Sequence, residues 1–358
     1  MRIGIVIHDF ALGGTERIAI RLAAAWSQMG VDVEIYCGGE FGPLRGLLAE
    51  EVQVTTPATP INRSWRSVYR LAKAARAHFE AHPVDALFVP GNFHWPIVPA
   101  VAKLPRDIRP VIVAQVSSAL EKPQRGRLRQ HWFEARMRRQ LAPADEVVAL
   151  SDETAIIARR ILPHARLTTI RLPALLDVTA PPVKVPPGPP ILVAAGRLVK
   201  QKDFPTLVDA FVILRHPTAR LVIIGSGPEE QAIRARITAL NLGAHVQLVG
   251  YVAEIRDWLD RSRLFVLPSI HEGYAAVIIE ALSAGRQVVA TDCTPAAREL
   301  LGSTLAGRVV PIGDPVALAA AIAATLAEPA PNPAALAQSV EGFRIGPIAR
   351  SYLDLLSA

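Results

Sequence analysis

The sequence of 358 residues contains only two cysteines, Cys37 and Cys293. They lie far apart and in no metal-like spacing, which argues against a disulfide framework or a structural zinc site and favours a reducing compartment. No run approaches the roughly 20 consecutive apolar residues that a membrane-spanning helix needs. The apolar segment 1–9 is too short for a secretory signal peptide. We therefore expect a cytoplasmic protein without a membrane span.

Length and apolar content indicate two domains. At roughly 150 residues per domain, a chain of this size corresponds to two. Apolar residues make up 51% of the sequence, enough for two buried cores. The formal net charge of +7 is uneven: residues 1–180 hold 23 Lys and Arg against 17 Asp and Glu, whereas residues 181–358 hold 16 against 15. The excess positive charge therefore lies in the first half.

Two stretches in the first half dominate this positive charge. They are Arg63, Arg66, Arg70, Lys73 and Arg76, then Lys122, Arg125, Arg127, Arg129, Arg136, Arg138 and Arg139. Interleaved with them are Trp65, Tyr69, Trp132, Phe133 and Met137. The spacing of the first set puts its charges on one face of a helix, and basic residues beside aromatics suit an interface with anionic lipids. The alternatives are a nucleic acid, an acidic acceptor, or a solvated surface whose aromatics belong to the core.

Both halves alternate short apolar runs with helical patterns, which predicts an α/β fold with parallel sheets. In the first half we expect strands at 3–8, 33–36, 86–89, 110–116, 146–150 and 167–170, and helices at 15–29, 64–80, 124–141 and 152–162. In the second half we expect strands at 191–195, 221–225, 246–249, 264–267, 287–290 and 308–310, and helices at 204–214, 228–240, 254–260, 274–284, 294–300, 314–328 and 346–357.

A proline-rich segment at 173–190 separates the two halves. Its composition excludes a helix or an inner strand and predicts a semi-rigid linker. The expected domains are therefore 1–172 and 191–345, followed by a last helix within 346–358.

The most informative motif lies at 269–285, where an apolar strand leads into a helix. Gly273–Ala276 should lie at the helix N-terminus, where free backbone N–H groups and the helix dipole attract an anion. Glu280 follows inside the apolar helix, where its carboxylate can accept hydrogen bonds from two vicinal hydroxyls, as on a ribose. Glu272 lies just before the turn, beside the expected sugar or phosphate. Two unrelated glutamates in an ordinary helix are the alternative, but a carboxylate among apolar residues needs a reason.

Three further turns follow strands and carry cations or glycines. Arg197 and Lys202 offer a planar fork and a point charge that suit a diphosphate. Gly225 lies in a turn that allows a ligand to approach the backbone. Gly13 and Gly14 precede the first helix, which Thr15 can cap.

Together these motifs resemble glycosyltransferase family 4, also called glycosyl transferases group 1. The resemblance rests on the spacing of Glu272 and Glu280 and on the runs GRLVKQKDF, IIGSGPE and FVLPSIHEGYAAVIIEALSAGRQVVAT, and it covers most of the second half and the first βα unit. It implies a GT-B fold, with two facing Rossmann-like domains and a cleft between them. The N-terminal domain would bind the acceptor, the C-terminal domain the nucleotide-sugar, and the last helix would cross back to the first domain.

The resemblance also implies roles for individual residues. Arg197 and Lys202 would bind the donor diphosphate, Glu280 the ribose, and Glu272 would lie beside the transferred sugar. Arg197, Lys202 and Glu272 are thus the predicted catalytic residues. The predicted donor-binding residues are Gly14, Arg197, Lys202, Gly225, Glu272, Gly273, Tyr274, Ala275, Ala276 and Glu280.

One departure from the family pattern concerns a histidine at the end of an N-terminal strand, which many members place against the donor sugar. Here Ser117 or Gln115 takes that place, and the nearest histidine, His94, belongs to an earlier loop. We therefore assign Gly13, His94 and Ser117 to the acceptor side. A loop histidine is more often structural or solvated than catalytic, which is the alternative for His94.

The implied reaction is a retaining hexosyl transfer in which the departing β-phosphate oxygen takes the proton of the acceptor hydroxyl. No Asp-x-Asp occurs in the sequence, so we expect no cofactor and no metal, with cations and helix dipoles taking the metal's role. The expected partners are a nucleotide-sugar donor and an acceptor glycan or glycolipid, with an anionic membrane surface as a candidate contact and no nucleic acid. A lipid-linked acceptor would place the protein at the inner face of the membrane.

Two other functions compete with this interpretation. A nucleotide-sugar epimerase or hydrolase of the same architecture would need acid and base carboxylates around the sugar, and only Glu272 qualifies. A non-catalytic sugar-nucleotide binder is disfavoured because Arg197, Lys202 and both glutamates are retained.

Overall fold

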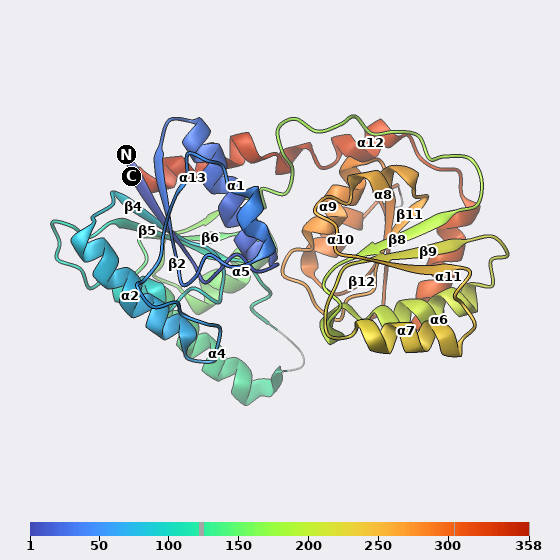
Figure 1. Ribbon diagram of the computed structural model, residues 1–358, viewed down its shortest axis with the longest axis horizontal. Helices are drawn as coiled ribbons and strands as arrows, with labels where there is room; N and C mark the ends of the chain where they lie inside the picture. The colour runs from blue at the N-terminus through green and yellow to red at the C-terminus, as the bar shows by residue number, and fades with distance from the viewer. Residues whose placement is uncertain (122–124, 304, 358) are drawn as a thin grey trace. The chain divides into compact units, whose positions relative to one another are not determined.

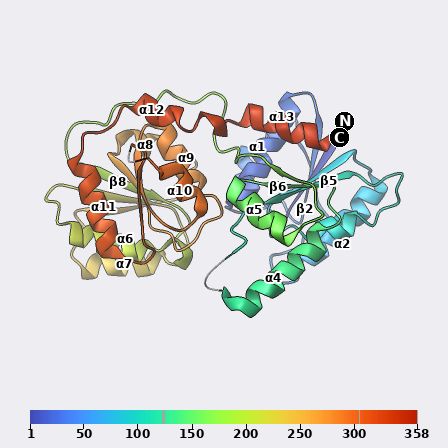
Figure 2. The same ribbon diagram turned by 180° about the vertical axis from the view of Figure 1, so that it is seen from behind.

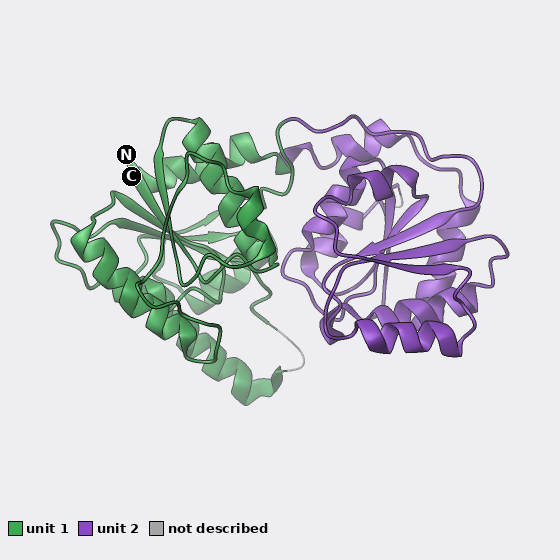
Figure 3. Cartoon of the chain, viewed as in Figure 1, with its two compact units in different colours: residues 1–177, 343–358 green, residues 178–342 purple. Residues whose placement is uncertain are grey.

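Short apolar runs pair side by side in two separate parallel sheets, one in each half of the chain. The computed structural model describes residues 1–121, 125–303 and 305–357, so Lys122 of the second basic stretch lies outside the described residues. Unit 1 comprises Met1–Asp177 and Phe343–Ala358, and unit 2 comprises Val178–Gly342 (Figure 3). The predicted α/β class with two parallel-sheet, Rossmann-like domains is confirmed.

The sheet of unit 1 has the strand order β3-β2-β1-β4-β5-β6-β7, and Figure 1 labels its strands β2, β4, β5 and β6. Its strands are β1 Arg2–Ile7, β2 Asp32–Cys37, β3 Gln53–Thr55, β4 Ala86–Val89, β5 Val111–Val116, β6 Glu146–Ala149 and β7 Leu167–Thr169. Its helices are α1 Gly14–Gln28, the 3₁₀ turn η1 Pro43–Leu47, α2 Ser67–Ala81, α3 Ile97–Val101, α4 Gly126–Leu141, α5 Asp152–Ile161 and α13 Ile345–Leu356. The direction in which successive strands are added to the sheet reverses between β1 and β4. Sheets of this kind bind ligands beside that point, at the carboxyl ends of the strands.

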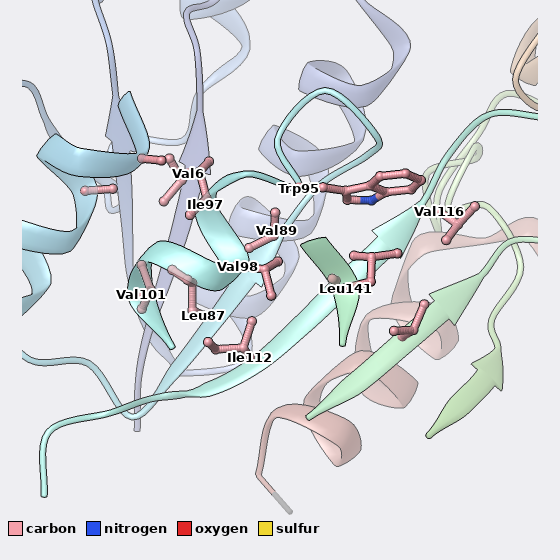
Figure 4. Packing of buried hydrophobic residues seen from close by; sticks show 14 of the residues in the cluster. Val6, Leu87, Val89, Trp95, Ile97, Val98, Val101, Ile112, Val116 and Leu141 are labelled. Carbon is pink, nitrogen blue, oxygen red and sulfur yellow. The ribbon is translucent and has the colours of Figure 1, made fainter. Parts of the chain in front are cut away.

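The core of unit 1 lies between this sheet and its covering helices (Figure 4). Parallel strands are buried on both faces, which is why Val111–Val116 reads as an almost continuous apolar run. Trp95, in the segment between β4 and α3, is fully buried, and its indole Nε1 donates to the Gln115 carbonyl at 3.0 Å. This hydrogen bond joins the loop after β4 to β5.

The last helix, α13, packs against α1 within unit 1, as both ribbon views show (Figures 1 and 2). Trp26 of α1 donates from Nε1 to the Ala349 carbonyl at 3.0 Å. The buried Tyr352 accepts from Gln115 Nε2 at 2.7 Å, and burial raises the pKa of its hydroxyl. These long-range contacts attach the end of the chain to its first half.

The sheet of unit 2 has the order β10-β9-β8-β11-β12-β13, which reverses between β8 and β11. Its strands are β8 Ile191–Ala195, β9 Arg220–Ile224, β10 Val246–Gly250, β11 Leu264–Leu267, β12 Gln287–Thr291 and β13 Gly307–Val310. Its helices are η3 Lys200–Lys202, α6 Phe204–Leu214, α7 Glu230–Ala239, α8 Arg256–Arg261, α9 Ala276–Ser283, α10 Pro295–Leu301, α11 Pro315–Ala327 and α12 Pro333–Gln338, and η4 Glu341–Phe343 spans the division between the units. No helix in the described part of the chain has the length and apolar character to cross a membrane.

The proline-rich segment is attached to both units by hydrogen bonds. Arg21 donates to the Ala174 carbonyl at 2.6 Å in unit 1, and Arg256 donates to the Ala180 carbonyl at 2.8 Å in unit 2. Arg286 is fully buried and donates to the carbonyls of Val183, Lys184, Leu259, Asp260 and Gly285 at 2.7–3.5 Å. This arginine therefore joins the segment to α8 and to the start of β12.

The structure corrects several expectations. Strand β3 and helices α3 and α12 were not predicted, because each is short and two of them contain proline. Helix α1 has Gly13 as its N-cap and no side-chain capping bond, so Thr15 does not cap it. Arg63 and Arg66 do not lie within helix α2, because α2 begins only at Ser67 with Arg66 as its N-cap, so only Arg70, Lys73 and Arg76 of the first basic stretch are helical.

Candidate functional site

Two sequence motifs meet at the carboxyl edge of the unit 2 sheet. Lys202 lies in η3, after β8, and Glu272 follows β11, the neighbouring strand across the reversal of strand order. Ile270 N donates to the Gln201 carbonyl at 2.8 Å, and Gln201 Nε2 donates to the His271 carbonyl at 2.7 Å. These reciprocal bonds hold the two segments side by side, at the position where doubly wound sheets bind ligands.

Glu272 receives two short hydrogen bonds on one oxygen. Lys202 Nζ donates to Oε1 at 2.6 Å and Ser269 Oγ donates to the same atom at 2.5 Å. The Lys202 and Glu272 side chains are only 16% and 10% exposed, so the pair is largely shielded from water. Charge-assisted bonds of this kind are strong and directional. Glu272 therefore fixes the position of the Lys202 ammonium.

The backbone around Lys202 is unusually crowded. A Cβ on Gly225, which follows β9 with φ +146°, would lie 1.9 Å from the Gly196 carbonyl oxygen. A Cβ on Gly196 would lie 2.9 Å from Lys202 Cε. Only glycines allow the turns after β8 and β9 to approach this closely. This packing explains why position 225 is a glycine. The contact of Gly225 with a nucleotide-sugar donor stays a prediction.

Helix α9 begins at Ala276, directly after Gly273, the buried Tyr274 and Ala275. Ala275 has φ +61°, a left-handed conformation that is costly for a residue with a Cβ and that occurs preferentially at functional sites. The first N–H groups of a helix have no partner within the helix, so this turn suits an anion. Glu280 lies four residues after Ala276 and therefore on the same face of the helix.

Arg197 and Cys293 complete the surroundings of the Lys202–Glu272 pair. The side chain of Arg197 is exposed and forms no hydrogen bond with residues in the described ranges, which leaves its guanidinium available to a ligand. Cys293 is buried, and its carbonyl accepts from Glu272 N at 2.9 Å. Burial and the nearby Glu272 carboxylate raise the pKa of the Cys293 thiol to about 12, so this cysteine is not a nucleophile at neutral pH.

In unit 1, Gly91 brings three elements together at the carboxyl edge of the sheet. It has φ +67°, and a Cβ there would lie 2.5 Å from Ser117 Oγ and 2.6 Å from Thr15 Cγ2. Ser117 N also donates to Asn92 Oδ1 at 2.9 Å. The end of β5 therefore lies against the first turn of α1, beside Gly13 and Gly14. Two of the three predicted acceptor-side residues, Gly13 and Ser117, are thus on neighbouring elements.

His94 and Gln115 have structural partners. The His94 ring is buried, with Nδ1 donating to the Pro90 carbonyl at 2.6 Å and Nε2 accepting from the His8 backbone N at 3.1 Å. Burial lowers the pKa of His94, which agrees with a neutral ring whose two nitrogens are both occupied. The Gln115 side chain points to Tyr352 instead of the sheet edge. Of the three residues considered for the place of the family's histidine, the geometry therefore favours Ser117.

The sequence interpretation missed a polar cluster at the end of β1. His8 and Asp9 follow the strand directly and are fully buried, and Asp9 binds Arg63, which in turn binds Glu16 of α1. Their position in the sequence could have identified them, because residues at the carboxyl end of the first strand of such a sheet frequently contact ligands.

Two family descriptions match most of the chain. Residues 179–341 match the family described as Glycosyl transferases group 1, and residues 12–173 match Glycosyltransferase Family 4. Among curated proteins, an N-acetylgalactosaminyltransferase of Campylobacter jejuni that acts on a diphospho-undecaprenol-linked sugar is 33% identical over 121 residues, or 34% of this chain and 33% of that protein. A lipopolysaccharide core mannosyltransferase, LpcC of Rhizobium leguminosarum, is 32% identical over 151 residues, or 40% and 43% of the two chains. These matches span less than half of either relative.

Solved structures resemble the chain over its whole length. A sucrose-phosphate synthase from Thermosynechococcus elongatus has a TM-score of 0.79 at 20% identity and covers 99% of this chain and 98% of its own. Anabaena HepE in complex with UDP and glucose has a TM-score of 0.78 at 19% identity, covering 100% and 99%. At these identities the likeness shows the shared fold.

Proposed function

Because the chain belongs to glycosyltransferase family 4, we propose that it transfers a sugar from a nucleotide-sugar donor to an acceptor hydroxyl with retention of configuration. The observation that carries this proposal is the convergence of Lys202, Glu272 and the start of α9 at the strand-order reversal of unit 2. A cation, a carboxylate and an anion-binding helix start in one place are the groups that a nucleoside diphosphate sugar requires.

In the proposed reaction the bond between the anomeric carbon and the β-phosphate oxygen breaks, and negative charge grows on the departing diphosphate. Lys202, held in place by Glu272, and the exposed Arg197 would stabilise that charge together with the N–H groups at the start of α9. The departing oxygen takes the proton of the acceptor hydroxyl, which attacks the same face of the sugar. Positioning and preorganised charge then supply most of the rate acceleration, without a strong protein base.

A thermal-shift panel of UDP-, GDP- and ADP-sugars tests this function. A donor present at 100 times its dissociation constant should stabilise the protein by about 2.7 kcal/mol, which gives a clear rise in Tm. UDP is the first choice of nucleotide, because HepE was solved with UDP and glucose. Absence of a shift with every nucleotide-sugar would contradict the proposed function.

The same panel, repeated after exhaustive EDTA treatment, tests the proposed metal independence. No group of three or more metal-ligating side chains occurs in the described part of the chain, and Lys202 and Arg197 provide positive charge for the donor. We expect donor binding and transfer to survive EDTA. Strict dependence on added Mn²⁺ or Mg²⁺ would refute the proposed electrostatics.

Replacing the two glutamates should separate nucleotide affinity from turnover. Glu280→Gln should weaken binding of both the donor and the free nucleoside diphosphate by about 1.5–3 kcal/mol, because a charged acceptor of ribose hydroxyls is lost. Glu272→Gln should reduce turnover more than nucleotide affinity, because it releases Lys202 from its fixed position. Calorimetry with UDP and steady-state kinetics measure the two effects, with Glu230→Gln at a partly exposed position of α7 as the control. Identical behaviour of both variants would show that their roles are not distinct.

For the acceptor we propose a lipid-linked glycan met at the cytoplasmic face of a membrane. Trp65 and Trp132 are 79% and 74% exposed, so these aromatics are not core residues, whereas Phe133 and Met137 are buried. Around the start of α2, Trp65, Arg66, Tyr69, Arg70 and Lys73 line one shallow groove. Exposed aromatics among cations suit a layer of anionic headgroups. The lipid-linked acceptor in the name of the Campylobacter jejuni relative is consistent with this choice.

Co-sedimentation with liposomes tests the membrane contact. We expect binding to vesicles that contain anionic lipid at about 0.1 M salt and release at about 0.5 M, because salt screens exposed charges. A variant with Trp65→Ala and Tyr69→Ala should bind more weakly, while Val316→Ala, which removes an exposed apolar side chain of unit 2, should bind like the wild type. Absence of binding at low salt would point to a soluble acceptor.

A further inference from the structure

A single arginine joins three segments at the carboxyl edge of the unit 1 sheet. Arg63 donates to both oxygens of Asp9, from Nε at 2.6 Å and from Nη2 at 2.7 Å, and Nη2 also donates to Glu16 Oε1 at 2.9 Å. Asp9 accepts a further bond from the backbone N of Ala11 at 2.9 Å. The loop before α2, the end of β1 and the first turn of α1 are thus held together by one guanidinium.

The charges of this cluster disfavour an anionic ligand. Burial by itself would raise the pKa of Asp9, but hydrogen bonds from His8 and Arg63 hold it well below its usual range. The hydrogen bonds with Asp9 raise the pKa of Arg63 above its usual value. Two carboxylates against one guanidinium leave a net negative charge, which repels phosphate and favours a neutral ligand that forms hydrogen bonds.

The cluster retains hydrogen-bonding capacity that the protein does not use. Arg63 is 44% exposed, and its Nη1 forms no hydrogen bond with residues in the described ranges. The buried His8 ring lies 3.1 Å from Asp9 through Nδ1, which donates because an ionised carboxylate only accepts. The buried Nε2 of the same ring has no partner among the described residues. A guanidinium N–H and an imidazole nitrogen are thus left for a ligand.

An exposed aromatic ring lies directly beside these groups. Phe93, in the loop after β4, is 43% exposed, and its centroid lies 5.7 Å both from the Arg63 guanidinium and from the His8 ring. Aromatic faces attract the slightly positive C–H edges of a partner as well as cations. A pyranose ring presents C–H groups on one face and hydroxyls that both donate and accept at its rim. It therefore matches the apolar face of Phe93 and the polar groups next to it.

We propose that Arg63 and Phe93 form a binding subsite for one neutral sugar ring of the acceptor, a specificity determinant within the function proposed above. Arg63 donates to sugar hydroxyls, and Phe93 packs against the C–H face beside the His8 ring. Asp9 and Glu16 are positioning residues that hold the guanidinium. The subsite adjoins Gly13, where an added Cβ would lie 2.1 Å from Glu16 Oε2. Arg63 also precedes Trp65 by two residues, so the subsite and the groove of α2 belong to one continuous segment.

Ligand-observed NMR with methyl glycosides of glucose, galactose, mannose and N-acetylglucosamine tests this subsite on the full chain. Single sugars bind weakly, so each probe is used at up to about 50 mM, well above a millimolar dissociation constant. We expect saturation transfer to at least one probe in the wild type, roughly tenfold weaker binding in Phe93→Ala, and wild-type binding in Phe93→Tyr, which keeps the ring. Phe41→Ala, which removes another exposed phenylalanine of unit 1, is the control and should bind like the wild type.

A conservative replacement of Arg63 tests the charged part of the subsite. Arg63→Lys should weaken sugar binding because a lysine cannot bind both carboxylates and a hydroxyl in the same fixed geometry. The Tm and the affinity for UDP, measured in the same samples, show whether each variant is folded and whether unit 2 is intact. With an acceptor substrate, Phe93→Ala should raise the acceptor KM by roughly tenfold and leave kcat and the donor KM unchanged.

Several outcomes would overturn the subsite. They are no binding of any probe to the wild type, unchanged binding in Phe93→Ala, or displacement of the sugar by inorganic phosphate. Failure of the proposed function is seen separately, because it would appear as absence of nucleotide binding in the UDP measurement. A protein that binds UDP but none of the methyl glycosides would keep its proposed function and lose this subsite.

Discussion

Replacement of Lys202 by alanine is expected to lower glycosyl transfer by roughly 10²-fold or more, because a preorganised cation that neutralises leaving-group charge in a shielded site is lost. Arg197→Ala should have an effect of the same order. Steady-state transfer with the donor identified by thermal shift measures both. Lys200→Ala, which removes an exposed lysine of the same 3₁₀ turn, is the matched control and should retain wild-type activity.

The two variants should differ in stability. Lys202→Ala leaves Glu272 largely buried without its ammonium partner, so its Tm should fall. The Arg197 side chain is exposed and has no hydrogen-bond partner in the described part of the chain, so Arg197→Ala should keep the wild-type Tm. Wild-type turnover in either variant would remove that residue from the proposed diphosphate site.

Replacement of Arg286 by methionine should lower the free energy of unfolding by about 3–5 kcal/mol, because several buried and partly buried carbonyls lose a charged donor at once. The guanidinium reaches the carbonyls of Val183, Leu259 and Asp260 at 2.7–3.0 Å, from segments far apart in sequence. Burial lowers the pKa of Arg286, because desolvation of the guanidinium outweighs the opposing effect of the Asp260 carboxylate. Urea unfolding followed by circular dichroism measures the loss.

A conservative variant and a surface control test this stability prediction. Arg286→Lys should also destabilise the protein, because three N–H groups on one nitrogen cannot reach carbonyls in the directions that a planar guanidinium serves. Arg234→Met removes an exposed ion pair with Glu230 on α7 and should change stability by less than about 1 kcal/mol. If Arg286→Met were as mild as Arg234→Met, the arginine would not be what holds the proline-rich segment to unit 2.

Local patterns in the sequence determined much of what the structure shows. Alternating apolar runs and helical stretches predicted the two parallel sheets, because each strand and helix must bury its own apolar residues. The turns after β8 and β11 were identified because glycines, cations and glutamates follow buried strands directly. Their roles as donor-binding residues stay predictions.

Other features were decided only by contacts between distant segments. Arg63 looked like the first charge of a helix face, yet it binds Asp9, which lies 54 positions earlier. Lys202 and Glu272 were predicted to share a donor, and the structure adds that they bind each other across 70 positions.

The role of His94 could not be predicted from its neighbours in sequence. Its two ring nitrogens form hydrogen bonds with backbone groups that follow β1 and β4 directly. Local periodicity determines which elements form, since it depends on residues three or four positions apart. The hydrogen-bond partner of a buried polar side chain depends on which strands become neighbours, and that is settled only when the sheet assembles.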